Sequence, residues 1–228
     1  MIKKCAVIGL GRFGTEVMRW LESHNIPVLA IDSDKDVVQR VADEEQVSGT
    51  MCCDCTDETA LREADVANME VVVVAIGDHH VENSIMVTTI LKQLGVKRIV
   101  ARASSELHAK ILRMVGATEA VNPEKEMGLR VARMIYAPNL REVIPFSTGA
   151  SIAEVDIPKS FIGQSMMELR LRSRYEINVI GIRRLPASKE EDKRFLKLSP
   201  KPDEPLEEGD ILVVVGTDSD VRKFTDVK

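Results

Sequence analysis

A glycine-rich turn near the start of the chain constrains its fold more than any other feature. The turn reads Gly9-Leu10-Gly11-Arg12-Phe13-Gly14, and it lies between the apolar run Cys5–Ile8 and a helical pattern that ends near Glu22. The first two glycines leave room for a tight turn and for backbone N–H groups to approach a phosphate. The third lets the helix pack closely on the strand. The motif therefore predicts a strand, a phosphate-binding turn and a helix, in that order.

A second apolar run, Val28–Ile31, ends at Asp32. An acidic residue at this distance from the turn is placed to accept hydrogen bonds from ribose hydroxyls. Strand, turn, helix and acidic residue together are typical of a βαβ unit that binds a nucleotide, whereas such a turn by itself also occurs without a ligand. Asp32 favours a ribose with free hydroxyls, and it does not distinguish ATP from NAD.

Short apolar runs alternate with helical patterns through the first half of the chain. The predicted strands are Cys5–Ile8, Val28–Ile31, Gly49–Cys53, Val71–Ile76, Arg98–Ala101 and Glu119–Val121. The predicted helices are Thr15–Glu22, Lys35–Ala42, Glu58–Ala64, Glu82–Leu94 and Glu106–Val115. This alternation is typical of an α/β fold with a Rossmann-like, doubly wound parallel sheet. The run Val71–Ile76 lacks polar alternation, so we expect it to be a central strand.

A boundary follows at Asn122-Pro123, which combines a favoured N-cap with proline at the first helical position. The next helix is expected to end before Pro138. Its apolar residues spread around more than one face, so it packs either between two subunits or inside one domain. We expect a nucleotide-binding N-domain at residues 1–122, this helix and a linker at 123–144, and a C-terminal module at 145–228.

The C-terminal module has the pattern of a small α+β domain. Its predicted strands are Ile152–Ile157, Asn178–Ile182 and Asp210–Val215, with one helix at Ser165–Arg174. The charged, proline-rich insert Pro186–Pro205 is expected to form a loop or a hairpin at the surface. A module of about 80 residues has a thin core and gains stability from dimerisation.

Composition excludes several classes of function. The chain has 228 residues, of which 44% are apolar, and a formal net charge of −5. This charge, with no basic run, argues against nucleic-acid binding. The longest uninterrupted apolar stretch, Val71–Ile76, is far shorter than a membrane span, and the chain starts directly with a strand and no signal sequence. We therefore expect a soluble, cytoplasmic protein, which can still serve a membrane partner.

The four cysteines are Cys5, Cys52, Cys53 and Cys55. Three of them lie in one short segment, where alternate side chains of a strand point to opposite faces and do not converge on a tetrahedral metal. We expect reduced, mostly buried thiols that act as small apolar side chains.

Charged residues at predicted strand ends are candidate ligand contacts. Arg12, inside the turn, can pair with phosphate in its own subunit or a neighbouring one, or it is a solvated surface residue. Asp54 follows the third strand and either reaches an adenine amino group or caps the next turn. Gly77-Asp78 follows the fourth strand, where the glycine allows close backbone approach. Arg102 ends the fifth strand and contacts either phosphate or an acidic side chain.

Glu124 lies in the first turn of the helix that Pro123 opens. It either complements the helix dipole or holds a divalent cation beside nucleotide phosphates. His79 and His80 lie near the predicted crevice and are expected to be loop residues, because the C-terminal module contributes neither a histidine nor a nucleophile motif.

The whole chain resembles the regulatory subunits of the Trk/Ktr potassium-uptake systems, the TrkA/KtrA family, which is built on the RCK (KTN) domain. The resemblance rests on Val7–Gly14, Asp32, Asp54–Asp57, Ala75–Asp78, Arg102, Asn122–Glu124 and Met127-Gly128, and in the second half on Ile152–Glu154 and Leu206–Gly216. Cys55 stands where the family more often has alanine.

The resemblance implies a cytosolic protein without catalytic activity that binds ATP, ADP or NAD(H), with Mg²⁺ or Ca²⁺ beside Glu124. It implies nucleotide contacts from Gly9, Leu10, Gly11, Arg12, Phe13, Gly14, Asp32, Ser33, Asp54, Cys55, Ile76, Gly77, Asp78 and Arg102. It also implies homodimers through the helix after Asn122, an octameric ring, and a potassium-translocating membrane subunit as the partner that this protein gates. The protein would then lie at the inner face of the cell membrane through that partner. Some family members bind a cyclic dinucleotide at the dimer interface of the C-terminal module, and this sequence leaves that open.

Two other functions stay compatible with the residues. One is an NAD-dependent oxidoreductase with its substrate between the domains, which requires turnover of NADH that depends on His79 or His80. The other is a nucleotide or cyclic-dinucleotide sensor for a different cation channel or antiporter, which co-purification with its membrane partner would distinguish.

Overall fold

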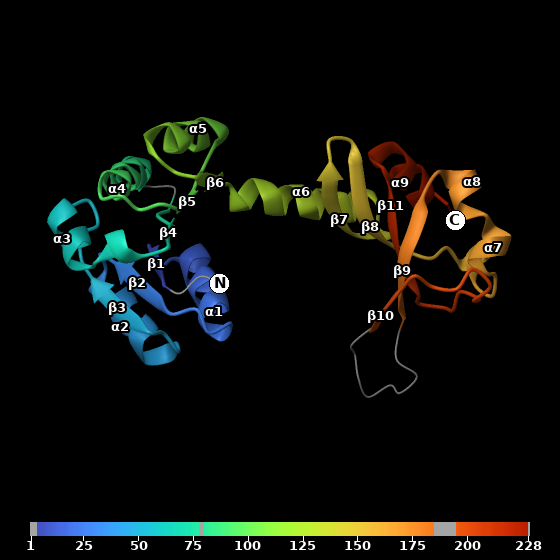
Figure 1. Ribbon diagram of the computed structural model, residues 1–228, viewed down its shortest axis with the longest axis horizontal. Helices are drawn as coiled ribbons and strands as arrows, with labels where there is room; N and C mark the ends of the chain where they lie inside the picture. Colours follow the sequence, from blue (N-terminus) through green and yellow to red (C-terminus); the bar gives the residue numbers. More distant parts are fainter. Residues whose placement is uncertain (1–3, 78–79, 185–194, 228) are drawn as a thin grey trace. The chain divides into compact units, whose positions relative to one another are not determined.

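The computed structural model describes residues 4–77, 80–184 and 195–227. The chain divides into two compact units, Met1–Met127 and Gly128–Lys228, and the boundary falls inside one helix, α6 (Pro123–Tyr136). Figure 1 labels the elements of both units. The first unit contains a parallel sheet with helices and the second an antiparallel sheet with short helices, so the predicted fold class is confirmed.

The first unit is built on a six-stranded parallel sheet with the order β3-β2-β1-β4-β5-β6. Its strands are β1 (Cys5–Ile8), β2 (Val28–Asp32), β3 (Gly49–Cys52), β4 (Val71–Val74), β5 (Ile99–Arg102) and β6 (Glu119–Val121). The chain runs outward from β1 to β3 and returns to β4 on the other side of β1. In open parallel sheets, ligands bind at the carboxyl ends of the strands beside such a reversal.

Helices cover both faces of this sheet. They are α1 (Arg12–Ser23), α2 (Lys35–Glu44), α3 (Glu58–Glu63), the 3₁₀-helix η1 (Val66–Asn68), α4 (Val81–Gln93) and α5 (Glu106–Val115). One face is packed by α1 and α2 through Met18 and Val41. The other is packed by α3, α4 and α5 through Leu61, Leu91 and Leu112. All four valines of β4 are buried, which explains why this strand reads as a continuous apolar run.

Side-chain caps fix where three of these helices begin, and Asp57 supplies the cap of α3. Asp34 accepts hydrogen bonds from the backbone of α2, and Ser105 does the same for α5. Helices α1 and α4 have no side-chain cap, and the N-cap of α1 is Gly11. The first backbone N–H groups of α1 therefore donate no hydrogen bond to a capping side chain. This end of the helix follows the glycine turn at the carboxyl end of β1.

The second unit is built on a five-stranded sheet with the order β10-β9-β11-β8-β7, in which every pairing is antiparallel. Its strands are β7 (Leu140–Ser147), β8 (Ala150–Asp156), β9 (Asn178–Arg184), β10 (Phe195–Leu198) and β11 (Ile211–Thr217). Its helices are η3 (Lys159–Phe161), α7 (Met166–Leu169), α8 (Leu171–Tyr175) and α9 (Asp218–Thr225). The core joins Phe161, Leu169 and Phe224 to Leu212 and Val214 of β11.

The structure differs from the sequence prediction in several places. Helix α1 begins at Arg12 and not at Thr15, so the helix starts inside the glycine motif. The single helix expected at Ser165–Arg174 is two short helices, because Arg170 between them has a left-handed backbone (φ 48°). Strand β7 and helix α9 were not predicted. Residues 186–194 of the expected loop or hairpin lie outside the described residues, and β10 after them pairs antiparallel with β9.

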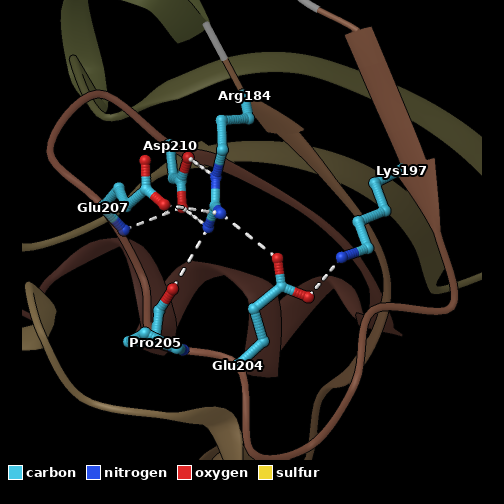
Figure 2. Close-up of polar contacts among 6 residues, drawn as sticks. All are labelled: Arg184, Lys197, Glu204, Pro205, Glu207 and Asp210. Atoms are coloured by element: carbon cyan, nitrogen blue, oxygen red, sulfur yellow. Dashed lines mark hydrogen bonds and ion pairs between the residues drawn. The ribbon is translucent and has the colours of Figure 1, made fainter. Parts of the chain in front are cut away.

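In the second unit, Arg184 at the end of β9 is the centre of a network of ion pairs and hydrogen bonds (Figure 2). The Arg184 guanidinium donates to both oxygens of Asp210 at 2.9 and 2.7 Å, to Glu207 at 2.8 Å and to Glu204 at 3.2 Å. It also donates to the carbonyl oxygen of Pro205 at 3.1 Å. Asp210 is only 1% exposed. The network therefore holds the segment before β11 against β9 and neutralises a buried carboxylate.

Candidate functional site

A cleft of about 470 Å³ lies at the carboxyl ends of strands β1 to β5 in the first unit. The residues that follow β1, β2, β3 and β4 contribute its walls, and Arg102 contributes from the end of β5. Helices α2 and α4 supply further side chains. The cleft thus occupies the place where the strand order reverses, which is where a parallel sheet of this kind binds ligands.

The structure accounts for the three glycines of the turn in different ways. Gly9 has φ +95°, and a Cβ there would lie 3.0 Å from the Ala75 carbonyl carbon. A Cβ at Gly14 would lie 1.9 Å from the carbonyl oxygen of Gly9. Gly11 has an ordinary extended backbone, and a Cβ there would meet nothing within 4 Å. The protein's own packing requires Gly9 and Gly14, whereas Gly11 leaves space on the cleft side of the turn.

Asp32 holds the glycine turn in place. Its Oδ2 accepts from the backbone N–H of Leu10 at 2.7 Å, and its Oδ1 accepts from that of Asp34 at 2.9 Å. Each carboxylate oxygen can accept more than one hydrogen bond, so these contacts are compatible with additional ones from ribose hydroxyls. Asp32 therefore connects β1, β2 and α2 at the floor of the cleft.

Asp54 caps the turn after β3. Its Oδ1 accepts from the backbone N–H of Thr56 at 2.9 Å and from the Thr56 hydroxyl at 2.7 Å. These hydrogen bonds, first that of the hydroxyl, lower the pKa of Asp54 below its ordinary value. The Asp54 side chain is thus a fixed anion at the rim of the cleft.

Arg102, which lines the cleft from the end of β5, forms an ion pair with Glu124. The Arg102 Nη2 donates to Glu124 Oε1 at 2.5 Å. Only 15% of the Arg102 side chain is exposed, against 57% of that of Glu124. The guanidinium lies beside Gly77, because a Cβ at that glycine would be 3.8 Å from Arg102 Nη1. The largely buried Arg102 guanidinium therefore lies in the wall of the cleft that the glycine turn also lines.

Comparison with known proteins identifies the family. A model of the TrkA-N domain matches residues 5–123, and a model of the TrkA-C domain matches residues 151–228. The chain is 35% identical to Ktr system potassium uptake protein C of Bacillus subtilis, over 98% of this chain and 96% of that protein. It is 33% identical to Ktr system potassium uptake protein A of Vibrio alginolyticus, over 94% of this chain and 92% of that protein. The chain belongs to the TrkA/Ktr family of potassium-uptake proteins.

Solved structures agree with this assignment at the level of the fold. The crystal structure of the GsuK RCK domain aligns with this TrkA/Ktr protein at a TM-score of 0.55 and 23% identity, over 97% of this chain and 45% of that one. The family models and the Ktr relatives confirm the resemblance drawn from the sequence. Among the helices that the structure describes, none is both long and apolar enough to cross a bilayer.

Most of the residues predicted to contact a nucleotide line this one cleft of the TrkA/Ktr chain. The predicted residues that line it are Gly9, Leu10, Gly11, Asp32, Ser33, Asp54, Cys55, Ile76, Gly77 and Arg102. Arg12, Phe13, Gly14 and Glu124 lie outside this lining, and Asp78 lies outside the described residues. Arg12 is exposed on the first turn of α1, and Phe13 packs against the core beneath that helix.

Two kinds of lining residue were missed: neighbours of the chosen residues near the strand ends, and side chains of helices α2 and α4, which the prediction did not consider. They are Ile8, Asp34, Val37, Arg40, Cys53, Thr56, Ala75, Asn83 and Val87, whereas His80, which was expected near the crevice as a loop residue, also lines the cleft. Val37 and Arg40 are three residues apart on α2, and Asn83 and Val87 are four apart on α4. Such spacings place two side chains on one helix face. Combined with the sheet order, they would have identified these helix contributions.

The cysteines are only partly as expected. Cys5 and Cys55 are buried, but Cys52 is exposed and Cys53 is half-buried, so the expectation of mostly buried thiols was wrong for Cys52. The β3 strand lies at the edge of the sheet, which leaves its last side chain open to solvent. Burial raises the pKa of Cys5 to about 11, and burial also raises the pKa of Cys53 and Cys55.

We expect iodoacetamide at pH 8 to label Cys52 first. The thiolate is the reacting form, and a thiol whose pKa is raised well above 8 stays protonated, so Cys5 and Cys55 should react at least about 100-fold more slowly. Peptide mass spectrometry against time measures each rate, and the denatured chain, in which all four thiols react alike, is the control. Labelling of Cys5 as fast as that of Cys52 would contradict the burial described above.

Proposed function

We propose that this TrkA/Ktr chain is a nucleotide-binding regulatory protein that gates a potassium-translocating membrane subunit. The observation that carries the proposal is the cleft that is lined both by the glycine turn, up to Gly11 at the N-cap of α1, and by Arg102. Backbone N–H groups at a helix N-terminus and a guanidinium are the groups that bind phosphate. The names of the Ktr relatives support potassium uptake as the process served.

The ligand we propose contains an adenosine diphosphate moiety, which ATP, ADP and NAD(H) share. Asp32 accepts from ribose hydroxyls and disfavours a 2′-phosphate. The phosphates lie on the turn and near Arg102, and Asp54 lies at the rim where an adenine amino group donates. Arg12 is exposed and does not line the cleft of its own chain, so the phosphate contact that we propose for it is to a nucleotide in a neighbouring subunit.

Glu124 is the candidate ligand for a cation that accompanies the nucleotide. Mg²⁺ is commonly held by one or two carboxylates together with substrate phosphates, so a single glutamate at the cleft end fits this ion. Glu124 engages Arg102 in the structure, and its remaining exposure leaves it accessible from solvent. The cation would supply positive charge between phosphate oxygens and Glu124.

Helix α6 is the surface we propose for homodimerisation. The helix has no buried residue, although it carries apolar side chains. The exposed ones are Met127, Leu129, Val131, Met134, Ile135 and Tyr136. A helix this apolar is stable in water when a second surface covers it. We propose dimers that assemble into an octameric ring, and a position at the inner face of the membrane through the potassium-translocating subunit.

The mechanism we propose is a shift of conformational population. A ligand changes the balance between two ring shapes only by the difference in its affinity for them. ATP and ADP differ in phosphate number, and NAD⁺ and NADH differ in charge. Protein contacts to the charged groups of the ligand are therefore the ones that can make its affinity differ between the two ring shapes. No bond of the ligand is broken in this scheme.

Calorimetric titration of ATP, ADP, NADH and cyclic di-AMP tests the proposal. We expect at least one adenine nucleotide to bind, and Arg12→Ala to weaken the affinity for ATP about tenfold, since a charge-assisted hydrogen bond contributes about 1.5–3 kcal/mol. Arg19→Ala on the same helix is the control, because Arg19 pairs with Glu16 and Glu45 away from the cleft. If no nucleotide bound, the proposed function would fail. An unchanged ATP affinity in Arg12→Ala would remove Arg12 from the site.

A further inference from the structure

We propose that the Arg102–Glu124 ion pair is a latch that the nucleotide phosphate opens. In this scheme the phosphate takes over the Arg102 guanidinium, and Glu124 with the first turn of α6 is released. The inference rests on the nucleotide site proposed above and adds the element through which occupancy of that site is sensed. It assigns the response to one ion pair between the end of β5 and the start of α6.

The two partners of the latch have unequal surroundings. Arg102 is the last residue of β5, lines the cleft, and is held with most of its side chain buried. Glu124 lies in the first turn of α6, and more than half of its side chain is exposed. A ligand in the cleft therefore reaches the arginine, whereas the glutamate is the partner that can move into solvent when displaced.

Phosphate and carboxylate compete for the same donors of the guanidinium. The Nη2 group of Arg102 is engaged by Glu124 at 2.5 Å, and Nη1 lies beside Gly77 in the cleft wall. A phosphate that binds a guanidinium in the favoured two-pronged manner needs two adjacent N–H groups. It also carries more negative charge than a carboxylate. The phosphate thus displaces Glu124 without any movement of the arginine out of the cleft.

Other contacts keep the start of α6 folded when the latch opens. Asn122 caps the helix, since its Oδ1 accepts from the backbone N–H of Lys125 at 2.9 Å. Lys125 also forms an ion pair with Glu106 of α5. Loss of the Glu124 contact therefore loosens the first turn rather than unfolding it. Because α6 continues from the first unit into the second, this turn is the start of the covalent path between them.

Thermodynamic linkage predicts the sign of the effect. If ligand binding must break the ion pair, the pair lowers ligand affinity by its own equilibrium constant. Partly exposed ion pairs are weak, so removal of Glu124 should raise the affinity for a nucleotide about two- to fivefold when no divalent cation is present. A Glu124 that acted only as a cation ligand would leave the affinity unchanged under those conditions.

The experiment compares the wild type, Glu124→Gln and Glu126→Gln as full-length proteins, with ADP as ligand in EDTA. Glu126 is the matched control, because it is an exposed acid in the same helical turn and forms no ion pair within residues 4–77, 80–184 and 195–227. Both substitutions remove one negative charge near the same helix N-terminus. We expect calorimetry to show tighter ADP binding for Glu124→Gln only.

Hydrogen exchange supplies a second readout that does not depend on affinity. The backbone N–H groups of Lys125 and Glu126 are bonded to Asn122, so their exchange reports the first turn of α6. We expect ADP to accelerate it in the wild type and in Glu126→Gln, and Glu124→Gln to exchange fast without ADP. Unchanged ADP affinity in Glu124→Gln, or exchange that ADP does not accelerate in the wild type, would overturn the latch alone. Failure of the wild type to bind any nucleotide would overturn the proposed site and the latch with it.

Discussion

Replacement of Arg184 by glutamine is expected to lower the free energy of unfolding of the second unit by about 3 kcal/mol. The substitution leaves the Asp210 carboxylate buried, at 1% exposure, without its cationic partner. Removal of one partner from a buried pair costs roughly 3–5 kcal/mol, because the remaining charge has lost its water and its counter-charge. Glu204 retains Lys197, which keeps the estimate at the lower end of that range.

Hydrogen exchange of the β11 backbone, measured on the full-length protein, reports the stability of the second unit separately from the first. Arg183→Gln is the matched control, since the neighbouring Arg183 pairs with Glu154 and its side chain is 38% exposed. It should cost no more than about 1 kcal/mol. The double substitution of Arg184→Gln and Asp210→Asn should be less destabilising than Arg184→Gln alone. Equal effects of Arg183→Gln and Arg184→Gln would show that burial of Asp210 does not set the energy.

Gly14→Ala is expected to cost far more stability than Gly11→Ala, whereas both are expected to weaken ligand binding. A Cβ at position 14 overlaps the Gly9 carbonyl oxygen at 1.9 Å, so α1 must move off the sheet. We expect a loss of about 3 kcal/mol or more in the free energy of unfolding of the first unit, at the upper end of the cost of overpacking. The glycine turn would be displaced with the helix, and nucleotide affinity lost with it.

Gly11→Ala separates ligand contact from folding. A Cβ there meets no protein atom within 4 Å, and the backbone angles suit any residue, so only the weaker N-cap preference of alanine acts, at about 1 kcal/mol. The same Cβ fills the space that a phosphate would occupy, so we expect at least a tenfold loss of nucleotide affinity. Denaturant unfolding and calorimetry on both variants measure the two quantities. Unchanged nucleotide affinity in Gly11→Ala would place the phosphates elsewhere.

Sequence alone predicted many of the cleft residues at the strand ends, because a parallel sheet brings its carboxyl ends to one edge. Gly9, Asp32 and Arg102 are examples. It did not predict strand β7, because Pro145 is unusual in a strand, and the structure places β7 at the sheet edge, where proline is tolerated.

The sequence also did not predict which residues far apart in the chain contact one another. Arg184 meets Glu204, Glu207 and Asp210 across 20 to 26 residues, a separation that no local pattern encodes. Helix α1 also began earlier than predicted, because Gly14 lowers the helical propensity of its first turn and only tertiary packing restores it. The prediction thus failed where pairing or packing, and not the local pattern, decides the structure.

The two hydrogen bonds that Asp32 accepts have a consequence for the speed of the response. The carboxylate already fixes the backbone on both sides of the cleft floor, at Leu10 and Asp34, before any ligand enters. A preorganised site loses little conformational entropy on binding, and its association needs no slow rearrangement of the floor. Occupancy of this cleft by the nucleotide proposed above would therefore follow the nucleotide concentration as it changes, with no delay from a rearranging floor.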